Sequence, residues 1–445
     1  MDRKGQAGGW PAIAVALAVA LFQLPLILNP GYFSHDELQW AAHATDPAFA
    51  MSVEGIWRDT QIFQYRPLTF SLWIWLSRLL FDQPFAFHAV LVAWGALNAA
   101  MLTCLLCRFG LATRPAVAAA LVFAMSAFAV QTHGWIGTIG DLSWVSCALL
   151  VGLLAQRDGA RWALVAGSGA LTAIALLSKE AGIVIPALTA LGWLMLGRRP
   201  AWAWATLGSG VVAALYLGLR LDAILFTPRT TTNYEWSAWF VPLRWAEYQL
   251  FPPMATRAGI TGLLPEGFAS PRVWFAGLVW LAMAWTFWRA GARWLLAFVL
   301  IGAAALGPVL ILAESANQYG YGFAAAIAGL GAALWSRTDR TGRIVLVLAA
   351  LLSVWHGVNV MRRMHEVGEL QSRFSPAMAQ AVSAADHYPV RLRALDPGQH
   401  WIYLRLSHQI HSYHGVAIGD RVQLVASDAP ADYVIGKDGA LTPAR

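Results

Sequence analysis

The chain has 445 residues and a formal net charge of +7, and it is 58% hydrophobic but only 12% charged. Soluble proteins carry roughly 25% charged residues, so this deficit, together with many long apolar runs, excludes an ordinary soluble protein. Many Lys and Arg residues fall in short loops between these runs, where they indicate membrane orientation rather than nucleic-acid binding. The composition predicts an all-α polytopic membrane bundle.

The first apolar segment, residues 10–28, contains no charge and is long enough to cross a bilayer. Arg3 and Lys4 precede it, as in a signal peptide, but residues 24–27 offer no small-x-small cleavage site. We therefore expect a retained first span that leads outward.

A long external loop, residues 29–84, is predicted next, and it begins with the adjacent acids Asp36 and Glu37. Carboxylates are costly to desolvate at a membrane surface, so their presence suggests chemistry at the boundary of water and lipid. Residues 67–81 of the same loop are short for a crossing and predict a helix that lies on or dips into the interface.

Ten further spans follow, with boundaries uncertain by a few residues. They are 85–107, 115–131, 141–155, 162–178, 181–196, 202–219, 273–288, 294–313, 322–335 and 343–360. The total of eleven, counted from an inside start, places the C-terminus outside and leaves 220–272 as a second long external loop. Residues 1–360 are thus predicted to form one transmembrane domain.

Residues 361–445 predict a small α/β domain outside the membrane. Short strands are predicted at 390–394, 401–404, 421–425 and 433–435, with a helix over 369–384. His408, His411 and His414 are spaced by three, but their strand-like flank favours solvated histidines over a metal site. Cys104 and Cys107 form a CxxC without a second pair, which favours packing over zinc.

Under this topology four polar clusters meet on the outer side of the membrane. They are His35-Asp36-Glu37 with Tyr65-Arg66-Pro67; residues 133–141; Lys179-Glu180; and Glu314, Gln318, Tyr319 and Tyr321. Acids and cations gathered at one face, among lipid, predict an enzyme that acts on a lipid-borne anionic substrate.

The chemistry of such a substrate indicates which catalytic groups the site needs. If the donor is a sugar on a polyprenyl phosphate, the leaving phosphate needs charge neutralisation, and the acceptor hydroxyl needs a base. One carboxylate and one or two cations then suffice, unlike the paired carboxyl groups of glycoside hydrolysis. A general base contributes roughly 10²–10⁴ in rate, and attack opposite the phosphate would invert the anomeric centre.

An ordered set of motifs within about residues 10–335 resembles the GT-C superfamily of membrane glycosyltransferases. The resemblance is closest to the transmembrane O-mannosyltransferases that carry tetratricopeptide repeats, and to their bacterial relatives. The motifs are Tyr65-Arg66-Pro67-Leu68-Thr69 with Pro84, Phe87-His88 and Asn98; Gly140-Asp141-Leu142; Leu177-Ser178-Lys179-Glu180; and, more weakly, His35-Asp36-Glu37 and Tyr319-Gly320-Tyr321. The family's H-T-E element becomes Gln131-Thr132-His133, and no repeats follow the last span, so the acceptor stays open.

The resemblance implies a polyprenyl-phosphate-sugar donor and a catalytic acid in the first external loop. We therefore assign Asp36 as the general base and Glu37 to acceptor or metal binding. Lys179 and Arg66 are assigned to the donor phosphate, with an ion pair and an interfacial anchor as their respective alternatives. Glu180 is assigned to orient Lys179.

Three further assignments keep a structural alternative. Asp141 either caps its span or orients donor, acceptor or metal. His133 is either a polar turn residue or a substrate contact, and Tyr319 and Tyr321 either belong to an aromatic belt or touch the donor. A divalent cation, held by Asp36 and Asp141 if it binds, stays open.

The sequence thus predicts an inverting glycosyltransferase of a bacterial inner membrane, with its active site facing the periplasm. Its partners would be the bilayer, an undecaprenyl-phosphate-type sugar donor, and a glycolipid, polysaccharide or protein acceptor. One alternative is a flippase of lipid-linked sugars, which would favour charges near the bilayer midplane and two related halves. The other is a non-catalytic scaffold, which leaves the acids, Arg66 and Lys179 unexplained.

Overall fold

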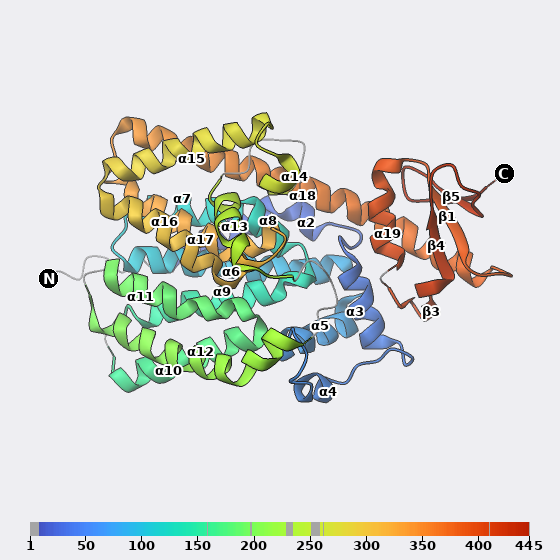
Figure 1. Ribbon diagram of the computed structural model, residues 1–445, viewed down its shortest axis with the longest axis horizontal. Coiled ribbons are helices and arrows are strands. Elements are labelled where there is room, and N and C mark those ends of the chain that lie inside the picture. The colour runs from blue at the N-terminus through green and yellow to red at the C-terminus, as the bar shows by residue number, and fades with distance from the viewer. Residues whose placement is uncertain are drawn as a thin grey trace.

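A computed structural model describes residues 9–157, 159–195, 198–227, 235–250, 259–260, 262–408 and 410–444. The protein is mostly helical, and Figure 1 shows long helices packed side by side with a small sheet at one end, beyond α18. Parts of the second long predicted loop, residues 228–234 and 251–258, lie outside the described residues.

The helices of the bundle are α1 (Trp10–Phe22), α2 (Leu24–Ile27), α6 (Pro84–Arg108), α7 (Thr113–Ala124), α8 (Ala127–His133), α9 (Ile139–Leu154), α10 (Arg161–Ser178), α11 (Ile185–Met195), α12 (Pro200–Phe226), α15 (Pro271–Arg289), α16 (Ala292–Leu306), α17 (Tyr321–Trp335) and α18 (Arg340–Ser383). The predicted loops carry α3 (His35–Thr45), α4 (Val53–Arg58), α5 (Pro67–Leu80), α13 (Val241–Gln249) and α14 (Leu263–Glu266). Short 3-10 turns η1 (Ile136–Thr138), η2 (Glu180–Val184), η5 (Gly307–Ile311) and η6 (Asn317–Gly320) join several of them.

Among the described residues, six helices are long and apolar enough to cross a membrane, and up to seven if the bent pair α7–α8 counts as one span. The protein is therefore an integral membrane protein. Each of the eleven predicted segments carries a helix, but α1, α11, α15 and α17 fall outside the six. The count of eleven stays a prediction.

The bend between α7 and α8 measures 63° and follows from local chemistry. The Ser126 side chain accepts a hydrogen bond from the Ala129 amide at 3.3 Å and so starts a new helix at this point. Gly357 of α18 packs directly on the Met125 carbonyl at the break, an approach that a Cβ would block. The bend carries the polar end of α8 towards α9.

The helix α18 runs through the predicted domain boundary at residue 360 without a break. The sequence predicts a span and a separate helix over 369–384, but residues 361–368 continue the apolar face. Met361, Met364 and Val367 are buried there, and the two methionines pack in a cluster with Leu26 of α2. One 44-residue helix therefore leads from the bundle into the C-terminal α/β part.

The C-terminal part has a four-stranded mixed sheet in the order β4-β1-β5-β6 and a two-stranded ribbon β2-β3. The strands are β1 (Val390–Ala394), β2 (Ser412–Tyr413), β3 (Val416–Ala417), β4 (Val422–Val425), β5 (Tyr433–Ile435) and β6 (Leu441–Pro443). β1 is parallel to β4 and β5, and β5 is antiparallel to β6. Three of the four predicted strands are thus confirmed.

The fourth, at 401–404, was predicted wrongly, because this stretch lies in helix α19 (His400–His408). Adjacent parallel strands need a crossover connection, and α19 supplies it between β1 and β4. Its buried residues Ile402, Tyr403 and Leu406 share a helical face. α19 and β2 both contact α3, so the C-terminal part lies against the first long loop (Figure 1).

Candidate functional site

The first turn of α3 is organised by a capping box, in which Ser34 is the N-cap residue and Glu37 the third residue of the helix. The Ser34 amide donates to Glu37 Oε2 at 3.2 Å, and the Ile136 amide donates to Glu37 Oε1 at 3.2 Å. Glu37 is fully buried, and burial, followed by the charge of Asp36, raises its pKa to about 8. Glu37 therefore joins α3 to η1, and both of its carboxylate oxygens accept from backbone amides. This arrangement does not favour the predicted role of Glu37 in binding the acceptor substrate or a metal.

Asp36 differs from Glu37 because its side chain remains 19% exposed. Its Oδ1 lies 3.3 Å from His35 Nε2. A Cβ on Gly137 would lie 2.7 Å from its Oδ2, so a glycine here leaves room for the carboxylate beside the connection between α8 and α9. Asp36 is thus the carboxylate of this helix turn that a substrate can approach.

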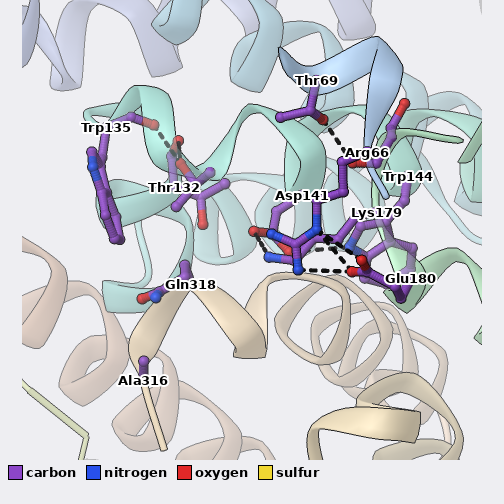
Figure 2. Close-up of polar contacts among 12 residues, drawn as sticks. Arg66, Thr69, Thr132, Trp135, Asp141, Trp144, Lys179, Glu180, Ala316 and Gln318 are labelled. Atoms are coloured by element: carbon purple, nitrogen blue, oxygen red, sulfur yellow. Dashed lines mark hydrogen bonds and ion pairs between the residues drawn. The ribbon is translucent and has the colours of Figure 1, made fainter. Parts of the chain in front are cut away.

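The second polar group is a buried ion pair between Lys179 and Asp141 (Figure 2). Asp141 lies in the first turn of α9, where its Oδ1 also accepts from Trp144 Nε1 at 3.2 Å. Lys179 directly follows α10, and its ammonium lies 5.1 Å from the centre of the Tyr319 ring. The side chains of Lys179 and Asp141 are only 8% and 3% exposed, so this cation is held by a carboxylate and an aromatic face.

The third group is a bidentate pair between Arg66, which precedes α5, and Glu180, which begins η2. Arg66 Nε donates to Glu180 Oε1 at 3.1 Å and to Oε2 at 2.8 Å, and Nη2 lies 2.7 Å from Oε2. The sequence assigned Glu180 to orient Lys179, but its carboxylate binds Arg66 instead. Lys179 has an extended backbone (φ −162°, ψ 139°) between α10 and η2, so it does not share a helix with Glu180, and the two side chains reach different partners.

Backbone packing holds these two ion pairs close together. Thr69 Oγ1 donates to the Ser178 carbonyl at 2.6 Å, which ties α5 to the end of α10. A Cβ on Gly140 would lie 2.8 Å from that carbonyl and 3.0 Å from Thr69 Oγ1, so α9 can approach only because residue 140 is glycine. The three sequence motifs that contain Arg66, Asp141 and Lys179 therefore meet at one place.

His133 and Tyr321 lie in a buried network and not at a surface. His133 Nδ1 is 2.9 Å from Gln23 Oε1, and His133 Nε2 is 3.0 Å from Tyr321 Oη, which also accepts from Asn98 Nδ2 at 3.1 Å. His133 and Tyr321 are fully buried. Their burial contradicts the alternatives of a polar turn residue for His133 and an aromatic belt for Tyr321, while a contact with substrate stays a prediction. A polar Gln23 inside the first apolar run is the signal that could have revealed this network.

The segment around the start of α17, residues 314–321, contributes further polar side chains beside the Asp141–Lys179 pair. Asn317 Nδ2 donates to Gln131 Oε1 at 2.9 Å, and Gln131 Nε2 donates to Gln318 Oε1 at 3.3 Å. Figure 2 shows Gln318 and Thr132 on one side of the Asp141–Lys179 pair and Glu180 on the other. Tyr319 is half-buried, so part of its ring remains exposed beside these polar side chains.

An apolar groove of about 360 Å³ lies between α13, α14 and α15. Its lining includes Trp245, Leu263, Phe268, Trp274, Gly277 and Trp280. The Tyr248 hydroxyl of α13 donates to the Ala316 carbonyl at 2.9 Å and so links the groove's wall to residues 314–318. Apart from the many aromatic residues of the second loop, no sequence pattern predicted this groove.

The described residues contain no group of three His, Cys, Asp or Glu side chains that could hold a metal ion. Asp141, one of the two carboxylates considered for a cation, is engaged by Lys179 and Trp144. The candidate site is therefore built from one partly exposed carboxylate and two carboxylate-paired cations.

Comparison with known proteins shows the fold. No family model matches the sequence, and no curated protein is significantly similar to it. The apo structure of ArnT from Cupriavidus metallidurans is similar, with 15% sequence identity, a TM-score of 0.51, and coverage of 86% of this chain and 82% of ArnT. A structure of the same ArnT bound to undecaprenyl phosphate gives 15% identity and a TM-score of 0.47, with 90% and 85% covered.

Proposed function

We propose that this protein is an inverting membrane glycosyltransferase of the GT-C type that uses a polyprenyl-phosphate-linked sugar. The proposal is carried by the arrangement around the start of α9: Asp36 packs on Gly137, just before α9, and the Lys179–Asp141 and Arg66–Glu180 pairs are held together by the packing at Gly140. The motif resemblance and the fold shared with apo ArnT support it.

The donor phosphate would bind at the two cations. A polyprenyl phosphodiester carries negative charge that competes with Asp141 and Glu180 for Lys179 and Arg66. The ammonium of Lys179 has three N–H donors, of which Asp141 accepts one, and Arg66 offers a planar fork suited to phosphate oxygens. The carboxylates would hold both cations in place before the donor arrives.

The reaction would proceed by displacement at the anomeric carbon. The acceptor hydroxyl oxygen forms the new glycosidic bond while the bond from the anomeric carbon to the phosphate oxygen breaks. Asp36 takes the hydroxyl proton, and the polyprenyl phosphate leaves with the bonding electron pair, its added negative charge stabilised by Lys179 and Arg66. Attack from the side opposite the phosphate inverts the sugar.

The isoprenoid chain would lie in the apolar groove between α13 and α15. The groove is lined by tryptophan and phenylalanine, and Tyr248 connects its wall to the segment that carries Tyr319. The segment from Ala316 to Tyr319 then links the wall of the groove to Lys179, because Ala316 accepts from Tyr248 and the Tyr319 ring lies over the Lys179 ammonium.

We place the enzyme in a bacterial inner membrane, with its site facing the periplasm, and its acceptor would be a glycolipid, a polysaccharide or a protein. A flippase remains the alternative. The charges at the first turn of α9 and just after the last turn of α10 favour the transferase, since transporters bind substrate at discontinuous helices near the midplane.

The test is transfer by the purified protein in nanodiscs, with undecaprenyl-phosphate sugars as donors and envelope extract as acceptor. Asp36→Asn should lower the transfer rate by roughly 10²-fold or more while donor binding persists. The matched control is Asp59→Asn, an exposed acid of the same loop, which should transfer normally. Full activity of Asp36→Asn refutes the base assignment, and donor flipping without transfer supports the alternative.

A further inference from the structure

Arg405 of α19 reaches from the C-terminal α/β part to the first turn of α3. Its Nη2 donates to Ser34 Oγ at 2.7 Å and lies 3.4 Å from His35 Nδ1. His35 in turn contacts Asp36, with 3.3 Å between Nε2 and Oδ1. Three side chains thus form a chain of contacts that ends on the carboxylate proposed as the general base.

The chemistry of arginine determines which groups donate and which accept in this series of contacts. A guanidinium carries only N–H donors, so the ring nitrogen that faces it, His35 Nδ1, must be an acceptor. The imidazole proton then lies on Nε2, where it is directed at Asp36 Oδ1. Ser34 Oγ, which accepts from Arg405, lies 3.3 Å from the same Nδ1 and can donate to it.

The surroundings also keep His35 neutral. Burial lowers its pKa, the charge of Asp36 opposes this, and the guanidinium of Arg405 lowers it further. The other titratable group in the turn is Glu37, which is buried against Ile136. Among the elements packed on α3, η1 has no titratable side chain, β2 contributes Tyr413, and Arg78 of α5 contacts the far end of the helix at Ala44.

We propose that Arg405 is a positioning residue: it holds His35 with its proton on Nε2, so that His35 binds Asp36 Oδ1 and leaves Oδ2 for the acceptor hydroxyl. The C-terminal α/β part then completes the site. This inference rests on the proposed role of Asp36. Oδ2 packs against Gly137, and the acceptor hydroxyl would approach it from the 19% of the Asp36 side chain that remains exposed.

A double-mutant cycle in the full-length protein tests the coupling. Arg405→Met and His35→Gln should each lower kcat by about tenfold, a small part of what a general base contributes, with the donor KM unchanged. If Arg405 acts through His35, the double variant should be no slower than the slower single variant. Losses that multiply would overturn the inference.

The pH profile is the second readout, and a purely structural role would not move it. Without Arg405, His35 takes up a second proton at higher pH, and the resulting imidazolium holds Asp36 in an ion pair. The acid limb of kcat should therefore move to higher pH in Arg405→Met. The matched control is Arg421→Met, which removes a guanidinium lying 4.9 Å from the Tyr388 ring in the same C-terminal part and should leave the limb in place.

A conservative variant covers the case in which Arg405→Met does not fold. Arg405→Lys keeps the charge and a donor, so its acid limb should stay near that of the wild type. A limb displaced equally in the Lys variant and in a second neutral variant, Arg405→Gln, overturns the proposal. Transfer that survives Asp36→Asn refutes the proposed function, whereas unchanged kcat and pH profile in Arg405→Met refute this inference alone.

Discussion

Glu37 provides a test of the site's architecture that does not depend on knowing the substrate. It is fully buried in the capping box of α3, and its pKa is raised to about 8 by burial and by Asp36. A carboxyl with a raised pKa binds its proton more tightly in the folded state than in the unfolded chain. Its stabilising contribution is therefore complete below its ordinary value of 4.5 and is lost as pH rises through about 8.

The magnitude follows from the difference between the two pKa values, at about 1.4 kcal/mol per unit. Between pH 6 and pH 8.5 the unfolded chain stays ionised while the folded carboxyl loses its proton. The free energy of unfolding should fall by about 2.5 kcal/mol from this group alone. Glu37→Gln removes the titration and keeps a residue type that capping boxes accept at this position. The variant loses one oxygen that accepts from a backbone amide, which should lower the free energy of unfolding by about 1 kcal/mol at every pH.

The assay compares the thermal unfolding of the wild type and Glu37→Gln in detergent, at pH 6 and pH 8.5. Hydrogen exchange of peptides from residues 34–45 follows α3 itself. The variant should be the less stable at pH 6 and should approach or pass the wild type at pH 8.5. The control is Glu54→Gln, an exposed acid of α4, whose curve should parallel that of the wild type. Parallel curves for Glu37→Gln and wild type would refute the buried, protonated Glu37.

The remaining predictions concern the cations and the groove. Lys179→Met leaves Asp141 as a buried unpaired charge and should destabilise the protein by about 3 kcal/mol, measured by thermal unfolding. The double variant with Asp141→Asn should recover that stability but not sugar transfer. Arg66→Lys loses the bidentate fork and should raise the donor KM by about tenfold in a transfer assay. Gly277→Leu adds a side chain in the groove, and should weaken transfer from undecaprenyl donors more than from short-chain analogues.

Matched variants separate these effects from general damage. Arg58→Lys alters an exposed arginine paired with Glu54 and should leave the KM unchanged. Gly218→Leu places the same side chain on α12, where a Cβ meets nothing within 4 Å, and should treat long and short donors alike. Recovery of transfer in the Lys179→Met, Asp141→Asn double variant would show that the ion pair is only structural. Equal losses with long and short donors in Gly277→Leu would exclude the groove as the isoprenoid site.

The helices of the bundle could be predicted because uncharged apolar runs of about 20 residues have few other solutions in a membrane. The placement of Asp36 and of the Lys179–Asp141 pair on connections at the same side of the bundle was also predictable in outline. Segments that alternate across the membrane return their connections to the same side. The contacts between α3 and η1, and between α9 and the end of α10, follow from this alternation.

The partners within the site could not be predicted, because they depend on which helices pack together. Glu180 pairs with Arg66 from a different loop, and His133 contacts Gln23 at the junction of α1 and α2. Arg405 lies in a stretch whose short alternation resembles a strand, and only the parallel pairing of β1 and β4 requires a helix there. No local pattern therefore pointed to its contact with Ser34.

The two ion pairs differ in burial, and this difference predicts which cation mainly binds the donor and which mainly stabilises the departing phosphate. The Arg66–Glu180 side chains are 14% and 24% exposed, whereas those of Lys179 and Asp141 are 8% and 3% exposed. Separating a pair costs less where water can solvate the released carboxylate, so Arg66 should engage the incoming phosphate first. Lys179, held in a drier site, acts most strongly on charge that develops as the phosphate departs. Arg66 should therefore affect mainly the donor KM and Lys179 mainly kcat.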